Sequence, residues 1–255
     1  MRNAWHPTDT KYGIQNTRHE RPLMPTVVEP PLFFLDYDGT LAPIVDDPAA
    51  AVPHPEAPDL LRDLDAQFPL WIVTGRDLQA LSSFLDRPYS AIGLHGAQEG
   101  VVGRDIHNRM SDEAAAALRR LRASVPSVDG LRVEDKARSF AVHYREARDE
   151  SGARDQLKDW LADLPEVLDA IWGKKVVELR PDGLTKGTAV RRIAAQHPDH
   201  VPVYLGDDVT DEDAFAALQE MDRDAVSIKV GPGDTRADAR LDGPDAVMAY
   251  LRRYV

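Results

Sequence analysis

Two aspartates stand directly after the first strongly apolar segment of the chain. Residues 32–35 read Leu-Phe-Phe-Leu, a run typical of a strand buried on both faces, as in a parallel sheet between layers of helices. Asp36 and Asp38 follow at once, and carboxylates there are costly unless they are solvated, paired or bound to a metal. Open α/β folds bind ligands at this end of a strand. We therefore expect a site here, and an acidic turn at Asp-Gly 38–39 is the alternative.

Other predicted strand and helix ends carry polar groups of complementary type. They are a hydroxyl, an ammonium and two carboxylates, supplied by Thr74, Lys186, Asp207 and Asp208. Carboxylates gathered at one sheet edge repel one another unless a divalent cation lies among them, and an all-oxygen set without His or Cys favours Mg²⁺. Together with Mg²⁺ and loop amides, the hydroxyl and the ammonium would form a phosphate cradle. An aspartate in such a cradle can attack phosphorus and form an aspartyl phosphate.

The elements that must position these residues alternate along the chain. Apolar runs at 32–35, 70–73 and 91–94 are separated by helical patterns, and the alternation resumes with strands at 202–205 and 226–230. Strands that alternate with helices indicate a parallel sheet with right-handed crossovers. The fold class predicted for the chain is therefore α/β, with the polar residues collected at one edge of the sheet.

The stretch between the two halves has a different pattern. Helical segments at 112–124 and 150–162 accompany two strands with a short connection and a third strand later, which predicts an inserted α+β module. Its strands alternate, so that Glu134, Lys136 and Glu178 share the face opposite to the apolar side chains. Mixed charges on that face would suit a hydroxyl-rich ligand, and a merely solvated sheet face is the alternative reading.

Composition narrows the classes of function. The 255 residues carry a net charge of −12, which argues against broad attraction to nucleic acid or to an anionic membrane. There is no cysteine, so disulfides, thiolate catalysis and Cys-ligated zinc are excluded. No apolar run approaches membrane-spanning length and no hydrophobic signal segment is seen, so we predict a cytoplasmic protein. Residues 1–29 show no period and are predicted to form a flexible tail.

Four motifs in order make the chain resemble the haloacid-dehalogenase (HAD) superfamily of phosphatases. They are DYDGT at 36–40, Thr74, Lys186, and GDDVTDED at 206–213. The resemblance covers residues 31–255 and implies a Rossmann-like HAD core, a parallel sheet flanked by helices, with a C2-type α+β cap inserted after the second motif. The expected domains are the core at 30–108 and 183–255 and the cap at 109–182.

The superfamily pattern also implies a role for each motif residue. Asp36 would be the nucleophile, and Asp38 would protonate the leaving oxygen and later activate water. Mg²⁺ would be held by Asp36, the main-chain carbonyl of Asp38 and Asp207. Thr74 and Lys186 would hold phosphate oxygens, because phosphoryl transfer depends mainly on positioning and electrostatics.

Two acidic residues near Asp207 are expected to play supporting parts. Asp208 would support the metal-bound waters or Lys186 rather than ligate the metal. Asp211 has a structural explanation as negative charge at a helix N-terminus, where it complements the helix dipole.

Motifs in the predicted cap narrow the resemblance to the trehalose-6-phosphate phosphatase family. VEDKARSFAVHYR at 133–145 and VVELRPDGLTKG at 176–187 are the most specific stretches, together with LHGAQE at 94–99. This implies hydrolysis of trehalose 6-phosphate to trehalose and phosphate, with a possible separate trehalose-6-phosphate synthase upstream. The residues expected to contact this sugar phosphate are Thr74, Gly75, Arg76, His95, Gly96, Glu134, Lys136, Arg138, Glu178 and Lys186.

Several alternatives stay open at this point. The substrate could be sucrose phosphate or mannosyl-3-phosphoglycerate, or the chain could be a phosphosugar mutase of the same fold. A mutase needs a second phosphate site in the cap, for which Arg132, Arg138 and Arg145 are available. A silent sugar-phosphate sensor would not need the nucleophile Asp36, and a purely structural domain would need none of the motif residues.

Overall fold

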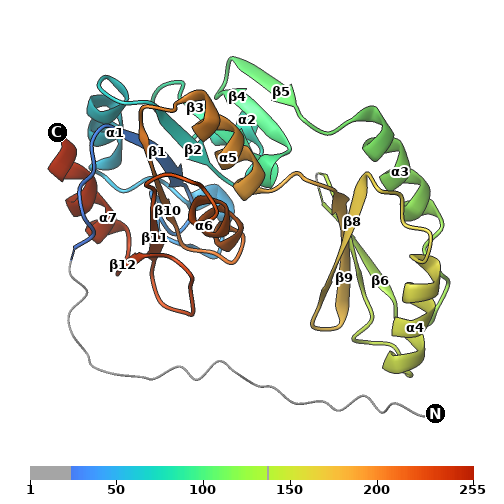
Figure 1. Cartoon of the computed structure of the whole chain (residues 1–255). Coiled ribbons are helices and arrows are strands. Elements are labelled where there is room, and N and C mark those ends of the chain that lie inside the picture. The colour runs from blue at the N-terminus through green and yellow to red at the C-terminus, as the bar shows by residue number, and fades with distance from the viewer. Residues whose placement is uncertain (1–23, 137) are drawn as a thin grey trace, which may run out of the picture.

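The computed structural model describes residues 24–136 and 138–255, which form two sheets with their helices (Figure 1). The larger sheet has eight strands in the order β12-β11-β10-β1-β2-β3-β4-β5. Their bounds are β1 Pro31–Asp36, β2 Leu70–Val73, β3 Ser90–Gly93, β4 Gln98–Val101, β5 Asp105–Asn108, β10 Val201–Gly206, β11 Val226–Val230 and β12 Ala239–Leu241. The pairs from β12 to β3 are parallel, which confirms the predicted α/β class.

Helices cover both faces of this sheet. They are α1 Ala57–Asp65, α2 Leu78–Leu81, α5 Lys186–Gln196, α6 Asp211–Gln219 and α7 Pro244–Leu251, with short 3-10 turns η1 Pro48–Ala50, η2 Leu94–Gly96 and η3 Arg252–Tyr254. Side chains of β1 alternate between the two cores. Phe33 and Leu35 pack with α1 and α7, whereas Leu32 and Phe34 pack with α5 and α6. Every residue of β1 is buried, as a central strand between two helical layers requires.

The second sheet is antiparallel and lies apart from the first (Figure 1). Its strands run in the order β6-β7-β9-β8, with bounds β6 Arg132–Asp135, β7 Phe140–His143, β8 Leu168–Gly173 and β9 Val176–Pro181. Helices α3 Asp112–Ala123 and α4 Glu150–Trp160 cover one face, where they enclose an apolar cluster around Val142, Leu157 and Val177. The opposite face carries the polar side chains that the alternation predicted.

Three features differ from the expectation. The hairpin of β4 and β5 extends the main sheet in antiparallel fashion, β8 adds a fourth strand to the second sheet, and β12 ends the main sheet. All three are strands at or beside a sheet edge, so their sequences do not need the apolar runs that reveal buried strands. Gly100 illustrates the hairpin's tight packing, because a Cβ there would lie 1.8 Å from the Asp105 carbonyl oxygen.

Part of the predicted tail falls inside the described chain. Residues 24–29 contain no helix or strand, yet they lie against α7 and η3. Tyr250 of α7 donates a hydrogen bond to the Thr26 carbonyl at 3.0 Å, and Arg253 of η3 donates one to the Pro25 carbonyl at 2.7 Å. Residues 1–23 lie outside the described residues. Within the part that is described, no helix has both the length and the apolar character needed to cross a membrane.

The apolar cluster between the second sheet and its helices predicts the cost of removing a side chain from it. Leu157 of α4 is 0% exposed, so Leu157→Ala should lower the free energy of unfolding by about 2–5 kcal/mol, the usual cost of a large-to-small core substitution. Ile44, at 74% exposed, supplies the control, because Ile44→Ala removes little buried area. Urea unfolding followed by circular dichroism measures both, and equal losses would contradict this packing.

Candidate active site

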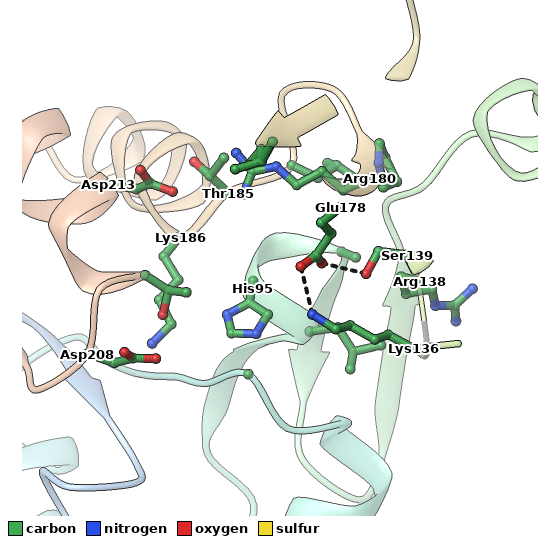
Figure 2. A pocket seen from close by; sticks show the side chains of 17 residues that line it. His95, Lys136, Arg138, Ser139, Glu178, Arg180, Thr185, Lys186, Asp208 and Asp213 are labelled. Carbon is green, nitrogen blue, oxygen red and sulfur yellow. Dashed lines mark hydrogen bonds and ion pairs between the residues drawn. The ribbon is translucent and has the colours of Figure 1, made fainter. Parts of the chain in front are cut away.

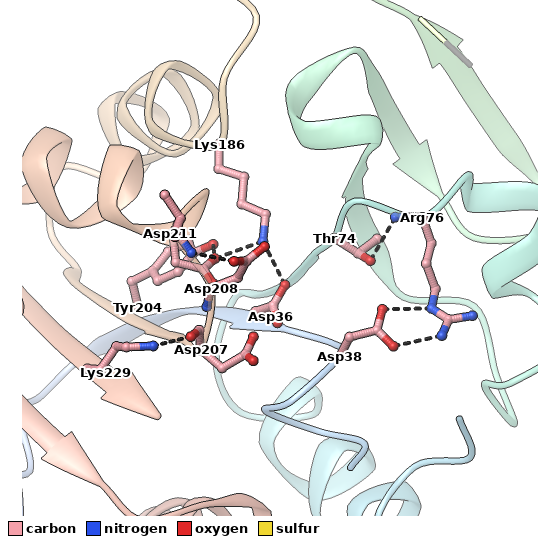
Figure 3. A network of polar contacts seen from close by, with 11 residues as sticks. Asp36, Asp38, Thr74, Arg76, Lys186, Tyr204, Asp207, Asp208, Asp211 and Lys229 are labelled. Atoms are coloured by element: carbon pink, nitrogen blue, oxygen red, sulfur yellow. Dashed lines mark hydrogen bonds and ion pairs between the residues drawn. The ribbon is translucent and has the colours of Figure 1, made fainter. Parts of the chain in front are cut away.

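The polar residues predicted at strand ends meet at one edge of the main sheet (Figure 3). Asp36 is the last residue of β1 and is paired in register with Val73, the last residue of β2, so Thr74 follows one residue beyond this pair. Asp207 follows the last residue of β10, which is also parallel to β1. Lys186 opens α5, whose N-terminus is closed by a capping box between Thr185 and Thr188. The parallel register of β1, β2 and β10, together with the start of α5, therefore brings four segments that are distant in the sequence to one site.

A buried ammonium holds the centre of the site. Lys186 is 2% exposed, and its Nζ donates hydrogen bonds of 2.7 Å to Asp36 Oδ1 and 2.8 Å to Asp211 Oδ1. Burial by itself would lower the pKa of Lys186, but the carboxylates of Asp36 and Asp211 outweigh burial and raise it. Lys186 is therefore a fixed positive charge at neutral pH.

Three carboxylates lie close enough to share one cation. Asp36, Asp207 and Asp211 each offer an oxygen, and these atoms lie within 4.8 Å of one another. Burial, followed by repulsion from Asp211 and Asp208, raises the pKa of Asp207 to about 6. The negative charge at this edge thus exceeds what Lys186 neutralises, and a set of hard oxygen donors suits a divalent cation such as Mg²⁺.

Gly39 leaves the space that this carboxylate cluster needs. Its φ is +74°, and a Cβ there would stand 2.1 Å from an Asp207 carboxylate oxygen. The loop after β1 can therefore pass directly over Asp207 only with glycine at this position. Lys229 holds the main chain of Asp207, because its buried Nζ donates a hydrogen bond to the Asp207 carbonyl. The sequence prediction missed Lys229, although a lysine inside the apolar strand β11 was a signal of a buried charge.

Asp38 is paired with Arg76. The guanidinium forms two hydrogen bonds of 2.7 Å to the two carboxylate oxygens, and it lies over the rings of Tyr37 and Phe84 at 5.3 Å and 4.8 Å. Arg76 was expected to contact substrate. In the structure it binds Asp38, so it holds this carboxylate in a defined orientation.

Thr74 is fully buried beside this pair. Its Oγ1 accepts a hydrogen bond of 3.0 Å from the Arg76 main-chain amide. Because a hydroxyl both accepts and donates, this bond leaves the Thr74 proton free to be donated to a phosphate oxygen.

The structure shows no bond between the Asp208 side chain and Lys186, which was one of the two supporting parts expected of Asp208. Lys186 bonds Asp211 instead, which is 0% exposed at the start of α6, whereas the exposed Asp208 side chain accepts from the Val209 amide. Gly206 explains why Asp211 is the partner of Lys186. A Cβ at this position would stand 2.3 Å from Asp211 Cγ, so only a glycine leaves space for the Asp211 side chain. A role of Asp208 toward metal-bound waters stays a prediction.

Two cavities adjoin at this edge, with His95 at their junction. The first, of about 480 Å³, is lined by Asp36, Asp38, Arg76, Lys186 and Asp207 among others. The second, of about 450 Å³, extends toward the second sheet, and Gly75, His95 and Lys186 line both. A Cβ on Gly75 would stand 2.6 Å from the His95 ring, and one on Gly96 would stand 2.6 Å from the Thr185 carbonyl oxygen. Both glycines therefore permit the close approach that places His95 between the cavities.

The polar face of the second sheet closes the other side of the second cavity (Figure 2). Glu178 accepts hydrogen bonds of 2.6 Å from Lys136 and 2.7 Å from Ser139. Burial opposes the charge of Glu178, but the bonds from Lys136 and Ser139 outweigh burial and lower its pKa. Arg138 also lines the cavity.

Not every predicted cap residue reaches the cavity. Glu134 shares the polar face, yet it bonds His143 at 2.8 Å and is not among the residues that line the cavity. Ser139, Ile171 and Arg180 do line it and were missed. Arg180 could have been found, because it has the same parity as Glu178 on β9, whereas Ile171 belongs to the unpredicted strand β8.

Comparison with known proteins gives a consistent result. A family model described as trehalose-phosphatase matches residues 34–245. A trehalose-6-phosphate phosphatase-related protein from Thermoplasma acidophilum is 34% identical over 81% of this chain and 89% of its own length. A trehalose-phosphate phosphatase from Mycobacterium marinum is 39% identical over 89% of this chain, which spans 62% of that relative.

A solved structure resembles the fold closely. The trehalose-6-phosphate phosphatase of Aspergillus fumigatus superposes with a TM-score of 0.72 at 28% identity, over 87% of this chain and 91% of that one.

The contact between Gly39 and Asp207 predicts a specific loss of metal binding. Gly39→Ala should weaken Mn²⁺ binding, measured by electron paramagnetic resonance, by at least about tenfold, because the new Cβ displaces the Asp207 carboxylate. Gly231→Ala is the matched control, since its φ of +75° imposes the same backbone strain and a Cβ there meets nothing within 4 Å. Equal Mn²⁺ affinities in the two variants would show that Asp207 does not hold the metal.

Proposed function

The chain belongs to the trehalose-phosphatase family, and from that membership we propose that it hydrolyses trehalose 6-phosphate to trehalose and phosphate. The observation that carries this proposal is the pair of adjoining cavities. One contains the charged groups for a phosphate, the other has a polar face suited to sugar hydroxyls, and both are lined by His95 and Lys186. We assign residues 30–108 and 183–255 to a catalytic core and 109–182 to a cap that selects the sugar.

The reaction we propose has two steps at one aspartate. A carboxylate oxygen of Asp36 attacks phosphorus as the bond from phosphorus to the sugar oxygen breaks, and Asp38 gives that oxygen its proton. Water then attacks the aspartyl phosphate, Asp38 takes the water's proton, and phosphate leaves with Asp36 restored. To act as acid, Asp38 has to separate from Arg76, so entry of the substrate phosphate between them is part of the proposal.

Fixed groups of this chain balance the phosphoryl charge. We propose that the ammonium of Lys186, which lines both cavities, and the hydroxyl of Thr74, which is buried directly after β2, hold the equatorial oxygens. The donor set fits a hard divalent cation, and we propose Mg²⁺, held by Asp36, Asp207 and the main-chain carbonyl of Asp38. When bound, this ion would withdraw charge from the phosphoryl oxygens.

The cap supplies the proposed sugar recognition. Glu178 and Lys136 form a charged pair that offers both acceptors and donors to hydroxyl groups, and Arg138 lies beside them. We also keep as proposals that the protein works in the cytoplasm and that a separate synthase supplies its substrate.

Phosphate release from a panel of sugar phosphates tests the function. The wild-type protein with Mg²⁺ should turn over trehalose 6-phosphate faster than sucrose 6-phosphate or glucose 6-phosphate, and EDTA should abolish turnover. Asp36→Asn should lower kcat by more than about 10³-fold, since the nucleophile is lost. Equal rates on all three substrates would contradict the substrate assignment, and full activity of Asp36→Asn would contradict the mechanism.

Cap recognition can be tested separately from chemistry. Glu178→Gln should raise KM for trehalose 6-phosphate by about tenfold, as expected for the loss of a charged hydrogen-bonding group, and leave hydrolysis of p-nitrophenyl phosphate unchanged. Glu150→Gln is the matched control, because Glu150 forms a 2.7 Å pair with Lys175 outside the cavity. The same KM for both variants would mean that the polar sheet face does not bind the sugar.

A further inference from the structure

Asp211 could have either of two roles in the carboxylate cluster. One of its oxygens lies within 4.8 Å of ligand atoms of Asp36 and Asp207, so by distance alone it could be a third metal ligand. It also lies 2.8 Å from the Lys186 ammonium, so it could instead be the residue that fixes Lys186. The two roles compete, because a carboxylate oxygen turned to a cation is withdrawn from its hydrogen-bond donors.

The hydrogen bonds of Asp211 favour one of these roles. Its Oδ1 accepts from Lys186 at 2.8 Å and from the Tyr204 hydroxyl at 2.6 Å, and its Oδ2 accepts from the Asp208 amide at 2.9 Å. A carboxylate has about four acceptor positions, of which three are thus occupied. The two donors on Oδ1 saturate the oxygen that Lys186 shares.

Tyr204 lies in the main sheet, and its hydroxyl contacts Asp211. It is 0% exposed on β10, paired in register with Phe34, and its ring packs on Phe34 and edge-on against Phe215. Burial, and then the carboxylates of Asp211 and Asp36, raise the pKa of Tyr204 well above its ordinary value, so the hydroxyl remains a donor. Within the described residues, Asp211 is the one hydrogen-bond partner recorded for this hydroxyl.

We infer that Tyr204 is a positioning residue that holds Asp211 as the partner of Lys186 and keeps it from ligating the metal. This inference rests on the proposed phosphatase function, because it assigns Lys186 to the substrate phosphate. With Tyr204 in place, Asp211 fixes the ammonium beside Asp36, and the metal is left to Asp36 and Asp207. Tyr204 lies outside the motifs identified in the sequence, so its contact with Asp211 emerges from the tertiary structure alone.

Removal of the hydroxyl tests the inference without altering the ring. In Tyr204→Phe, Asp211 Oδ1 loses one donor and becomes available to the metal, so Mn²⁺ affinity should rise several-fold by electron paramagnetic resonance without substrate. Lys186 loses its fixed partner, so kcat on p-nitrophenyl phosphate should fall by about tenfold or more, the effect of one lost charged hydrogen bond. Tyr250→Phe is the control, because that buried tyrosine likewise donates to a partner, the Thr26 carbonyl, remote from the site.

Two results would overturn the inference. One is a Tyr204→Phe protein that loses stability as Tyr250→Phe does while kcat and Mn²⁺ affinity both remain at wild-type values. The other is a fall in Mn²⁺ affinity, which would make Tyr204 a support of the metal site.

A second variant decides the matter if Tyr204→Phe does not fold. Asp211→Asn should lower kcat strongly and change Mn²⁺ affinity by no more than a few-fold, whereas the loss of a metal ligand, or of an outer-shell group that supports one, would lower the affinity by about tenfold or more. A loss of that size would overturn the inference. Failure of the proposed substrate is separately visible, as wild-type turnover of p-nitrophenyl phosphate without turnover of trehalose 6-phosphate, and it leaves the Mn²⁺ measurements valid.

Discussion

The buried ion pair network around Lys186 is the interaction on which the site depends. Its ammonium joins Asp36 at the end of β1 to Asp211 at the start of α6, while Lys186 itself opens α5. A buried charge is tolerable only if its partners are complete, and removal of one partner costs several kcal/mol. These ion pairs therefore hold β1, α5 and α6 together. They also fix the positive charge of Lys186 beside the cavity.

The two sheets divide the chemistry between them. The main sheet has a central strand buried on both faces, and together with the helices α5 and α6 it supplies the carboxylates, the ammonium and the hydroxyl. The second sheet has one apolar face under its helices and one polar face toward the cavity. The backbone at the junction is strained, since Leu94 and His95 have φ of 46° and 56°, which non-glycine residues rarely adopt. That conformation places the His95 side chain where the two cavities adjoin.

Most of the architecture could be predicted from the sequence because buried strands need continuous apolar runs. The strands around 32–35, 70–73 and 202–205 were predictable for that reason, and so was the polar face with Lys136 and Glu178. Strands β4, β5, β8 and β12 lie at or beside sheet edges, where the partner strand and not the local sequence decides that they form. Their absence from the prediction also concealed Ile171 at the cavity.

The sequence alone determined which residue types the site contains, since Asp36, Thr74, Lys186 and Asp207 each follow or begin an element that had to meet at one sheet edge. It could not determine which acidic residue serves Lys186. Both Asp208 and Asp211 are acidic residues of the same motif, and only the space left by Gly206 and the hydroxyl of Tyr204 bring Asp211 to the ammonium. Spacing along a chain fixes which strand end a residue occupies, whereas hydrogen-bond partners depend on distances between segments that only the tertiary structure sets.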